Sequence, residues 1–409
     1  MDYKITAPQR IVGEIDLPAS KSMSNRALLL NALSEQQSKI ANVAQCDDTE
    51  AVARALNRPQ AAEVNVGRAG TAMRFLTAYY ALQQGRTVTL DGDARMRVRP
   101  IGVLVDALRQ LGASIEYARQ EGFPPLKITG TRLRGGTVTM RGDVSSQFTS
   151  AILMIAPIMG GLRLHLTGEI TSRPYIDMTL GLMRRWGIPA QWAESHIIDV
   201  PGGQYMSANM SIESDWSAAS YWYALQALLP ESHITLRGLS LNSLQGDCRI
   251  AEIMAQMGVK GREHDGHIDL LCDRPGPCCC STFADMSGTP DLAPTLVVTL
   301  CLLGRSFRIT GLRTLRIKES NRLEALRTEL MKLGYVVKIE SNDSMSWHFE
   351  RCTPLPQPRI ATHGDHRMAM ALSLASVKHP GLVIEDAEVV SKSYPQFWEQ
   401  MRNAGFRIV

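Results

Sequence analysis

The chain has 409 residues, of which 44% are hydrophobic and 21% are charged, a composition typical of a globular protein with two or three domains. Its formal net charge is only +4, with Lys and Arg scattered along the whole length, and this argues against a nucleic-acid-binding protein. The longest apolar runs, 151–162 and 296–304, are too short to cross a bilayer. The residues after Met1 look like a strand and not like a signal or transit segment, so we expect a cytoplasmic protein without membrane contact.

Six clusters of Ser, Thr, Gly or Asp each open an apolar, helix-like run. In chain order they are Ser20-Lys21-Ser22, Gly70-Thr71-Ala72, Ser145-Ser146-Gln147, Ser214-Asp215-Trp216, Gly288-Thr289-Pro290 and Gly364-Asp365-His366. Small and capping residues at a helix start leave backbone N–H groups that, with the helix dipole, favour anions. Cationic side chains fall inside or just after these openings: Lys21, Arg26, Arg74, His366 and Arg367. The pattern predicts a protein that gathers anionic small molecules.

A unit of similar order follows each opening. The fifth unit is predicted to contain a helix at 291–303, a strand at 307–310, a helix at 319–333, and strands at 335–340, 344–349 and 359–362. Gly follows the second helix of several units, where a left-handed C-cap is required: Gly112, Gly187, Gly258 and Gly334. The alternative interpretation is that such units arise by chance in any α/β protein.

The sixth unit lacks its last two strands. It is predicted to contain helices at 366–378 and 395–403 and strands at 382–386 and 406–409. We expect residues 3–6 and 11–17 to supply the missing strands. Three units per domain then predict one domain at 20–213 and another at 214–409 plus 1–19, with the active site in the cleft between them. Two chain crossings would allow hinge closure.

Three polar motifs could carry chemistry. Lys318 and Arg322 stand four residues apart and would share a helix face, although a solvated helix start with ion pairs is the alternative. His366 and Arg367 place two cationic donors at a helix start, which favours phosphate or carboxylate. In the third motif, alternate residues of an extended stretch would project to one side, or form an exposed basic strand: Arg95, Arg97 and Arg99.

Other motifs are weaker or absent. Residues 145–147 and 172–175 supply hydroxyl and amide donors, which helix capping also explains. None of the eight cysteines has zinc-site spacing, and Cys278–Cys280 are interpreted as a loop-to-strand segment with reduced thiols. The sequence contains no Walker loop, GxGxxG, HExxH or GxSxG element, so nucleotide-dependent phosphoryl transfer, metalloprotease and serine-hydrolase functions lack support.

Together these segments resemble one family, the 3-phosphoshikimate 1-carboxyvinyltransferases (EPSP synthases). The similar stretches are 18–26, 69–74, 95–100, 143–147, 172–175, 316–322, 365–370 and 392–395. The resemblance implies a mixed α/β fold of two similar domains, each with three βαβαββ units and helices packed inside mixed sheets. It implies transfer of the enolpyruvyl group of phosphoenolpyruvate to the 5-hydroxyl of shikimate 3-phosphate, with release of phosphate and without a metal or other cofactor.

The resemblance also implies site residues. Those expected to bind shikimate 3-phosphate are Lys21, Ser22, Arg26, Ser145, Ser146, Gln147, Ser172, Tyr175, Asp291, Thr314 and Lys318. Those expected to bind phosphoenolpyruvate are Lys21, Gly70, Arg99, Gln147, Arg322, Arg367 and Lys392. Asp291 would accept the hydroxyl proton, and Glu319 and Lys392 would move the proton at the methylene carbon, with His366 nearby and Lys21 a further catalytic candidate. The two substrates bring a charge of about −5 to −6, which these cations would balance.

Three residues depart from the family's usual pattern. Arg68 stands where Asn is usual, Phe75 where Pro is frequent, and Thr314 where many members have an Asn that contacts the shikimate phosphate. The chain is also shorter than many relatives, chiefly in the first unit. Arg68 would add a cation beside the expected phosphoenolpyruvate site.

Three alternatives remain. A UDP-amino-sugar enolpyruvyl transferase shares the fold but resembles the segments at 318–322 and 365–367 poorly. A non-catalytic binder of phosphorylated metabolites would not need proton-transfer groups such as Asp291, Glu319 and Lys392. An RNA 3′-phosphate cyclase would need nucleotide chemistry. We expect a monomer with two small-molecule substrates.

Overall fold

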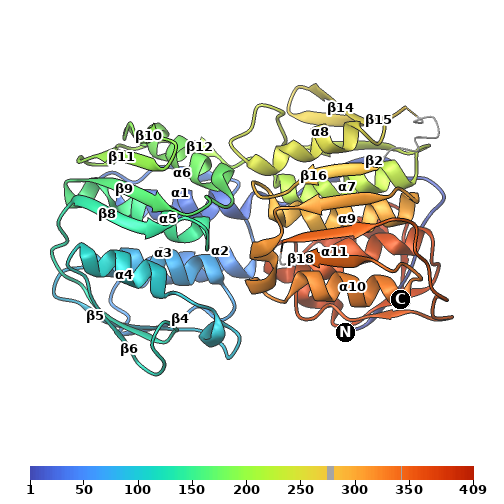
Figure 1. Cartoon of the computed structure of the whole chain (residues 1–409). Helices are drawn as coiled ribbons and strands as arrows, with labels where there is room; N and C mark the ends of the chain where they lie inside the picture. Colours follow the sequence, from blue (N-terminus) through green and yellow to red (C-terminus); the bar gives the residue numbers. More distant parts are fainter. Residues whose placement is uncertain (274–280, 342) are drawn as a thin grey trace. The chain divides into compact units, whose positions relative to one another are not determined.

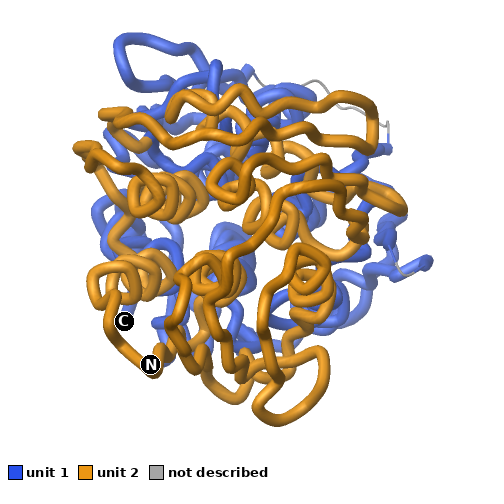
Figure 2. The backbone as a smooth tube through the Cα atoms, turned by 90° about the vertical axis from the view of Figure 1, so that its left-hand side faces the viewer, with its two compact units in different colours: residues 1–18, 213–409 blue, residues 19–212 orange. Residues whose placement is uncertain are grey.

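The computed structural model describes residues 1–273, 281–341 and 343–409, so Cys278–Cys280 lie outside the described residues. The described chain divides into two compact units, coloured separately in Figure 2. Unit 1 comprises residues 1–18 and 213–409, and unit 2 comprises residues 19–212. The chain therefore passes from one unit to the other near residue 18 and again near residue 212.

A four-stranded mixed sheet is the repeating element. In unit 2 one such sheet contains, in spatial order, β4 (Glu63–Asn65), β5 (Thr87–Asp91), β7 (Leu126–Thr129) and β6 (Ser114–Tyr117). β4 is parallel to β5, whereas β7 is antiparallel to both of its neighbours. Val88 and Leu90 of β5, and Leu126 and Ile128 of β7, are buried because alternate side chains of a strand point to the same face.

The same order recurs in the other four-stranded sheets of the described residues. Unit 2 adds β8 (Gly136–Arg141), β9 (Gly161–Thr167), β11 (Ile197–Pro201) and β10 (Gln191–Glu194). One sheet of unit 1 contains β2 (Val12–Asp16), β13 (His233–Arg237), β15 (His267–Cys272) and β14 (Val259–His264). A second sheet contains β16 (Thr282–Asp285), β17 (Phe307–Thr310), β19 (Ser344–Trp347) and β18 (Lys338–Ser341). A third sheet contains β20 (Arg359–Ile360), β21 (Leu382–Ile384), β1 (Tyr3–Thr6) and β22 (Arg407–Ile408). Each sheet begins with a parallel pair and continues with two antiparallel pairings. The predicted mixed α/β fold is confirmed.

The N-terminal strands separate after residue 6. β1 lies between β21 and β22, so the prediction that residues 3–6 complete the sixth unit is confirmed. The same prediction for residues 11–17 is wrong, because β2 pairs in parallel with β13. The segment that precedes the fourth helical run, β12 (Met210–Ser211), pairs instead with β3 (Ile40–Ala41) of unit 2. Each crossing segment thus adds a strand to one unit and then leads into a helix of the other.

Three helices in each unit form its interior. They are α1 (Lys21–Leu33), α3 (Gly70–Ala81) and α5 (Ser146–Ile155) in unit 2, and α7 (Trp216–Leu228), α9 (Ala293–Leu303) and α11 (His366–Ser373) in unit 1. Every residue of α3 and α7 is buried, as expected for helices that are largely apolar on all sides. α1, α3 and α5 contact one another, and α9 contacts both α7 and α11. In Figure 1, α3 lies between the two four-stranded sheets of unit 2.

Shorter or amphipathic helices complete the units. They are α2 (Asp47–Leu56), α4 (Gly102–Gln110), α6 (Arg173–Arg185), α8 (Ile250–Ala255), α10 (Arg322–Lys332) and α12 (Phe397–Asn403). Single 3₁₀ turns are η1 (Met96–Val98), η2 (Pro157–Met159), η3 (Gly246–Arg249), η4 (Pro290–Leu292), η5 (Arg313–Ile317), η6 (Leu374–Val377) and η7 (Ala387–Lys392). The predicted left-handed glycines after the second helices are confirmed, because Gly112, Gly187, Gly258 and Gly334 all have φ between 84° and 95°.

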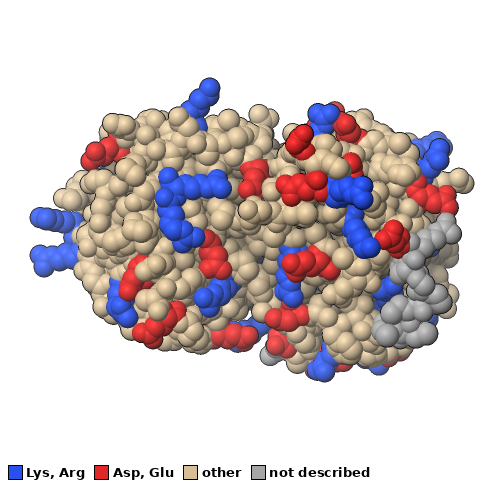
Figure 3. Space-filling model, turned by 90° about the horizontal axis from the view of Figure 1, so that it is seen from above, with Lys and Arg blue, Asp and Glu red and all other residues tan. Residues whose placement is uncertain are grey.

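All six predicted openings stand at helix starts. The side chains of four N-cap residues accept a backbone N–H from the first turn: Ser20, Ser145, Asp215 and Asp365. The second opening begins α3 at Gly70, and the fifth begins η4, which runs directly into α9. No helix in the described part of the chain is both long and apolar enough to span a membrane. Acidic and basic side chains are interspersed on the face shown in Figure 3, in keeping with the small net charge.

Candidate active site

Three helix starts of unit 1 meet at a network of charged side chains. Arg367, the second residue of α11, donates from Nη2 to Ser217 Oγ of α7 at 3.2 Å and to Asp291 Oδ2 of η4 at 3.0 Å. These bonds bring the starts of α7, α11 and the turn before α9 to one place. We call the charged residues gathered there the Asp291 network; they are Asp291, Lys318, Glu319, Arg322, Asp365, Arg367 and Lys392.

Asp291 faces three cations. Its Oδ1 lies 2.8 Å from Arg322 Nη1 and 3.5 Å from Lys318 Nζ, and its Oδ2 lies 3.0 Å from Arg367 Nη2. Burial alone would raise the pKa of this carboxyl, but the charges of Arg367, Lys318 and Arg322 outweigh it and hold the pKa well below its ordinary value. Asp291 is therefore ionised, and surrounded by more positive charge than it can neutralise.

Arg322 is the buried centre of the network. Its guanidinium is 1% exposed and bonds Asp365 through Nε at 2.7 Å, Asp291 through Nη1 at 2.8 Å and Glu319 through Nη2 at 3.1 Å. Burial opposes its charge, yet the carboxylates of Asp365, Asp291 and Glu319 raise its pKa above the ordinary value. A charge buried this deeply is tolerated because it is fully paired.

Lys392 and Glu319 form a second, tighter pair in the network. Lys392 Nζ at the end of η7 donates to Glu319 Oε1 at 2.6 Å, and its side chain is only 6% exposed. The other oxygen of Glu319 accepts from Arg322. An ammonium and a carboxylate in direct hydrogen-bond contact can exchange a proton without an intervening water.

The prediction that Lys318 and Arg322 share a helix face is wrong. α10 begins only at Arg322, where Asn321 caps Glu324 N, and Lys318 is extended after η5. Contacts of residues 318–322 explain why this segment is not helical. Ser320 Oγ donates to Asp365 Oδ2, and the side chains of Lys318 and Arg322 both reach Asp291.

Two further predicted residues of unit 1 lie beside the network. His366, the first residue of α11, is 1% exposed, and its Nδ1 lies 3.6 Å from Asp365 Oδ1. Thr314 is buried in η5, which packs against η4, the turn that carries Asp291. The hydroxyl of Thr314 has no hydrogen-bond partner among the described residues.

In unit 2, Lys21 and Ser22 are the first residues of α1. Lys21 Nζ lies 3.2 Å from Asp48 Oδ2 at the start of α2, and Asp48 is buried. Ser22 offers its backbone carbonyl to Arg26 Nη1 at 2.9 Å. Sequence reasoning missed Asp48, because acidic residues in a first turn indicate a helix start and not the presence of a nearby cation.

Arg26 is buried between α1, α5 and α6. It donates to Thr179 Oγ1 at 2.7 Å, Ser150 Oγ at 3.0 Å and the carbonyl of Tyr175 at 3.2 Å. Its guanidinium also lies 5.4 Å from the ring centre of Phe75, so this unusual residue packs against a predicted ligand-binding cation. Burial lowers the pKa of Arg26 to about 10, which leaves it charged at neutral pH.

Gly70 lies against two guanidinium groups. A Cβ on Gly70 would stand 2.6 Å from Arg99 Nη1 and 3.1 Å from Arg74 Nη1. The prediction that residues 95–99 are extended is wrong, since 96–98 form the turn η1. Arg97 turns to Asp91, with Nη2 to Oδ2 at 2.6 Å, while Arg99 turns to the start of α3. The turn forms because Asp93 accepts the N–H of Met96.

The neutral donors lie at the starts of α5 and α6. Gln147 Nε2 donates to Thr71 Oγ1 at 3.2 Å, which joins the starts of α5 and α3. Ser145 caps α5, Ser146 is its first residue, and Ser172 precedes α6 in a left-handed conformation with φ 54°. Non-Gly residues rarely adopt this conformation, and here it brings a buried hydroxyl to the helix start.

The unusual Arg68 has a nearby counter-charge. Its Nε lies 2.9 Å from Asp93 Oδ2, with the two side chains 53% and 32% exposed. The extra cation expected from the sequence is thus paired at the surface of unit 2.

Comparisons with known proteins give a consistent result. The family model described as EPSP synthase (3-phosphoshikimate 1-carboxyvinyltransferase) matches residues 5–58 and 54–401. A 3-phosphoshikimate 1-carboxyvinyltransferase of Bacteroides fragilis strain YCH46 is 48% identical over 409 residues, covering 100% of this chain and 99% of that protein. One from Vibrio cholerae serotype O1 strain M66-2 is 38% identical over 418 residues, covering 95% of this chain and 96% of its own. A solved EPSP synthase of Acinetobacter baumannii has the same fold, with a TM-score of 0.78, 22% identity, and coverage of 100% and 99%.

Proposed function

Because the chain belongs to the EPSP synthase (3-phosphoshikimate 1-carboxyvinyltransferase) family, we propose that it transfers the enolpyruvyl group of phosphoenolpyruvate to the 5-hydroxyl of shikimate 3-phosphate and releases phosphate. The observation that carries the proposal is the Asp291 network, in which cations for anionic substrates lie beside a hydrogen-bonded Lys–Glu pair. Binding alone would need the cations but not the pair.

We assign phosphoenolpyruvate to the cations Arg322, Arg367 and Lys392 of unit 1 together with Lys21 and Arg99 of unit 2. Shikimate 3-phosphate is assigned to the hydroxyl and amide donors at the starts of α5 and α6, together with Arg26, Lys318 and Asp291. Both units therefore serve one site. Substrates that bind cations of both units would favour closure, and small-angle scattering should then show a more compact particle with both ligands than without them.

In the addition step, the 5-hydroxyl oxygen attacks C2 of phosphoenolpyruvate while C3 accepts a proton. Asp291 takes the hydroxyl proton. Its pKa is far too low for this in the free protein, but the substrate anions occupy the same cations and raise it by charge repulsion. The base is thereby activated only when both substrates are bound.

Lys392 supplies the C3 proton, and its ammonium donates to Glu319 Oε1 at 2.6 Å. The product of addition is a tetrahedral ketal phosphate. In the elimination step a proton leaves C3 of the new methyl group for Glu319 or Lys392, the C–O bond to phosphate breaks, and the double bond re-forms. Arg322 and Arg367 stabilise the departing phosphate.

A phosphate-release assay with both substrates tests the proposal, and the wild-type chain should turn over only when both are present. Turnover with a UDP-amino sugar instead would favour the related transferase, and binding without turnover would favour a metabolite sensor. Either result would overturn the proposal. In the described residues, no three His, Cys, Asp or Glu side chains are placed to hold a metal ion.

We also propose that the enzyme acts in the cytoplasm as a monomer without a cofactor. One chain supplies all of the cations and proton-transfer groups named above. Sedimentation in the presence of both substrates tests the monomer, and activity after treatment with a chelator tests the cofactor.

A further inference from the structure

Asp247 is a buried carboxylate of unit 1 for which the mechanism above has no role. It lies in η3 and is 2% exposed. Burial raises its pKa to about 6, against the opposing effect of the Arg367 charge. A carboxylate kept charged inside a protein at neutral pH is costly, so its contacts indicate what it is for.

The hydroxyl of Ser217 connects Asp247 to Arg367. Ser217 Oγ donates its hydrogen to Asp247 Oδ2, and the same oxygen accepts from Arg367 Nη2 at 3.2 Å. A hydroxyl has one hydrogen and two lone pairs, and an ionised carboxylate can only accept. The hydroxyl hydrogen of Ser217 is therefore directed to Asp247, and a lone pair of the Ser217 oxygen then faces the Arg367 guanidinium.

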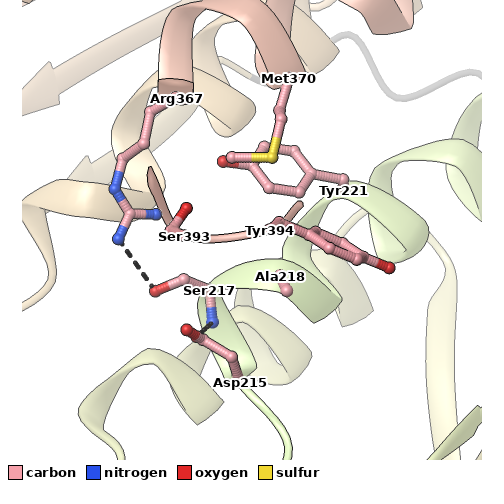
Figure 4. Close-up of a pocket in the computed structure, with 8 residues that line it drawn as sticks. All are labelled: Asp215, Ser217, Ala218, Tyr221, Arg367, Met370, Ser393 and Tyr394. Carbon is pink, nitrogen blue, oxygen red and sulfur yellow. Dashed lines mark hydrogen bonds between the residues drawn. The ribbon is translucent and has the colours of Figure 1, made fainter. Parts of the chain in front are cut away.

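Ser217 is itself held in place at the start of α7. Its backbone N–H donates to Asp215 Oδ1 at 2.8 Å, as the dashed line in Figure 4 shows. Figure 4 also shows the guanidinium of Arg367 directed to the Ser217 hydroxyl across a pocket lined by Ser393 and Tyr394. The pocket offers only about 10 Å³, room for the centre of one water molecule. Tyr221, which also lines the pocket, is a further hydrogen-bond partner of the guanidinium, so the Ser217 bond is one of the contacts that fix its direction.

The second contact of Arg367 changes during the reaction. Asp291 Oδ2 accepts from the same Nη2 at 3.0 Å, but in the proposed mechanism Asp291 takes the substrate proton and loses its charge. A neutral carboxyl holds a guanidinium less firmly than a carboxylate does. The contact through Ser217 and Asp247 has no part in proton transfer and persists.

We propose that Asp247 and Ser217 are positioning residues, which hold the Arg367 guanidinium toward phosphoenolpyruvate while Asp291 changes protonation. The inference rests on the proposed function, because it takes Arg367 as a phosphoenolpyruvate ligand. It adds a function for two residues that neither substrate is expected to contact.

The test is steady-state kinetics on Asp247→Asn, Ser217→Ala and the double variant. Each single variant should raise the KM for phosphoenolpyruvate about tenfold, with the KM for shikimate 3-phosphate within about twofold of wild type. The double variant should be no worse than Ser217→Ala alone, because without the Ser217 hydroxyl residue 247 is no longer connected to Arg367.

The matched control is Asp269→Asn. Asp269 Oδ1 accepts from Thr235 Oγ1 at 2.6 Å within the sheet of β13 and β15, so it is also a carboxylate–hydroxyl pair of unit 1, but away from the network. Its kinetic constants should stay within about twofold of wild type. A similar KM rise in the control would assign the effect to general loosening of unit 1 and overturn the proposal.

Two other outcomes also decide the matter. If wild type is active and both folded single variants keep the wild-type KM for phosphoenolpyruvate, the positioning role fails while the proposed function stands. If wild type shows no turnover, the proposed function fails, and the positioning role fails with it. Should Asp247→Asn not fold, Ser217→Ala decides alone, because it removes a single oxygen.

Discussion

The two units are built from the same type of sheet but differ in the polar groups at their helix starts. In unit 1, Arg322 is bound by the three carboxylates of Asp291, Glu319 and Asp365. In unit 2, the comparable buried cation, Arg26, is bound by hydroxyl and carbonyl oxygens, and none of those four bonds is to a carboxylate. Carboxylates can accept a proton near neutral pH and hydroxyl or carbonyl oxygens cannot, so in the proposed function proton transfer belongs to unit 1, whereas both units bind anions.

The sharpest way to break this comparison is to remove a proton carrier of unit 1. Lys392→Ala takes away the ammonium that lies 2.6 Å from Glu319, and kcat should fall by about a thousandfold. The KM values should change much less, because several other cations still bind the anions. Single-turnover phosphate release measures the effect, and a loss confined to KM would move proton transfer elsewhere.

The next largest effect is on stability and concerns buried charge in unit 1. The folded-state pKa of Asp247 is raised to about 6, so between pH 4 and pH 6 the folded chain binds more protons than the unfolded chain. The contribution of this group to the free energy of unfolding therefore falls as the pH rises through that window. The Asn side chain of Asp247→Asn does not titrate, so the variant lacks this fall in the free energy of unfolding.

Urea unfolding of wild type and Asp247→Asn at pH 5 and pH 8 measures this difference in the free energy of unfolding. From the lower to the higher pH, the stability of Asp247→Asn relative to wild type should rise by about 1.4 kcal/mol, the part of the titration that lies above pH 5. A constant difference would show that Asp247 does not titrate in this range.

A smaller effect tests the binding role of unit 2. Gly70→Ala would bring a methyl group to 2.6 Å from Arg99 Nη1, so the guanidinium must move away from the start of α3. The KM for phosphoenolpyruvate should rise about tenfold with kcat changed far less. Initial rates at varied phosphoenolpyruvate measure both, and an equal loss in kcat would place Arg99 among the groups that act in the transition state.

The smallest effect is expected at Arg68. Its pairing with Asp93 is largely exposed, and such pairs contribute less than about 1 kcal/mol. Arg68→Asn, which introduces the residue usual in the family, should change the KM for phosphoenolpyruvate by less than about threefold at physiological salt. A larger change would show that Arg68 leaves Asp93 when substrate binds.

Local signals in the sequence were sufficient for some of the fold. Capping residues such as Ser20 and Asp365 predicted where buried helices begin, because an N-cap is recognised by its own chemistry. Partner choice between distant strands was not predictable in this way. β2 fits the sheet of β21 as well as that of β13 by pattern alone, and only the structure shows that it pairs with β13.

In the candidate active site, too, local motifs were predictable from the sequence and contacts between distant residues were not. The cations Arg322 and Arg367 stood out in short motifs, but their partners Ser217 and Asp247 lie far away in the sequence and look like ordinary polar residues. The predictions for residues 95–99 and 318–322 are wrong because regularly spaced cations do not require a regular strand or helix. Side chains of Asp93 and Asp365 bend both segments into turns that no periodicity reveals.

The place of β1 has a consequence for how the chain matures on the ribosome. Residues 3–6 emerge long before residues 382–384 and 407–408, with which they pair. Residues 19–212 form a continuous stretch and can finish folding during translation. Unit 1 cannot pair β1 with its two neighbouring strands until residues 382–384 and 407–408 have been synthesised. Nascent chains arrested far enough beyond residue 212 for that residue to leave the ribosome should therefore already protect residues 19–212 from protease, while residues 3–6 stay open to cleavage until residues 382–408 emerge.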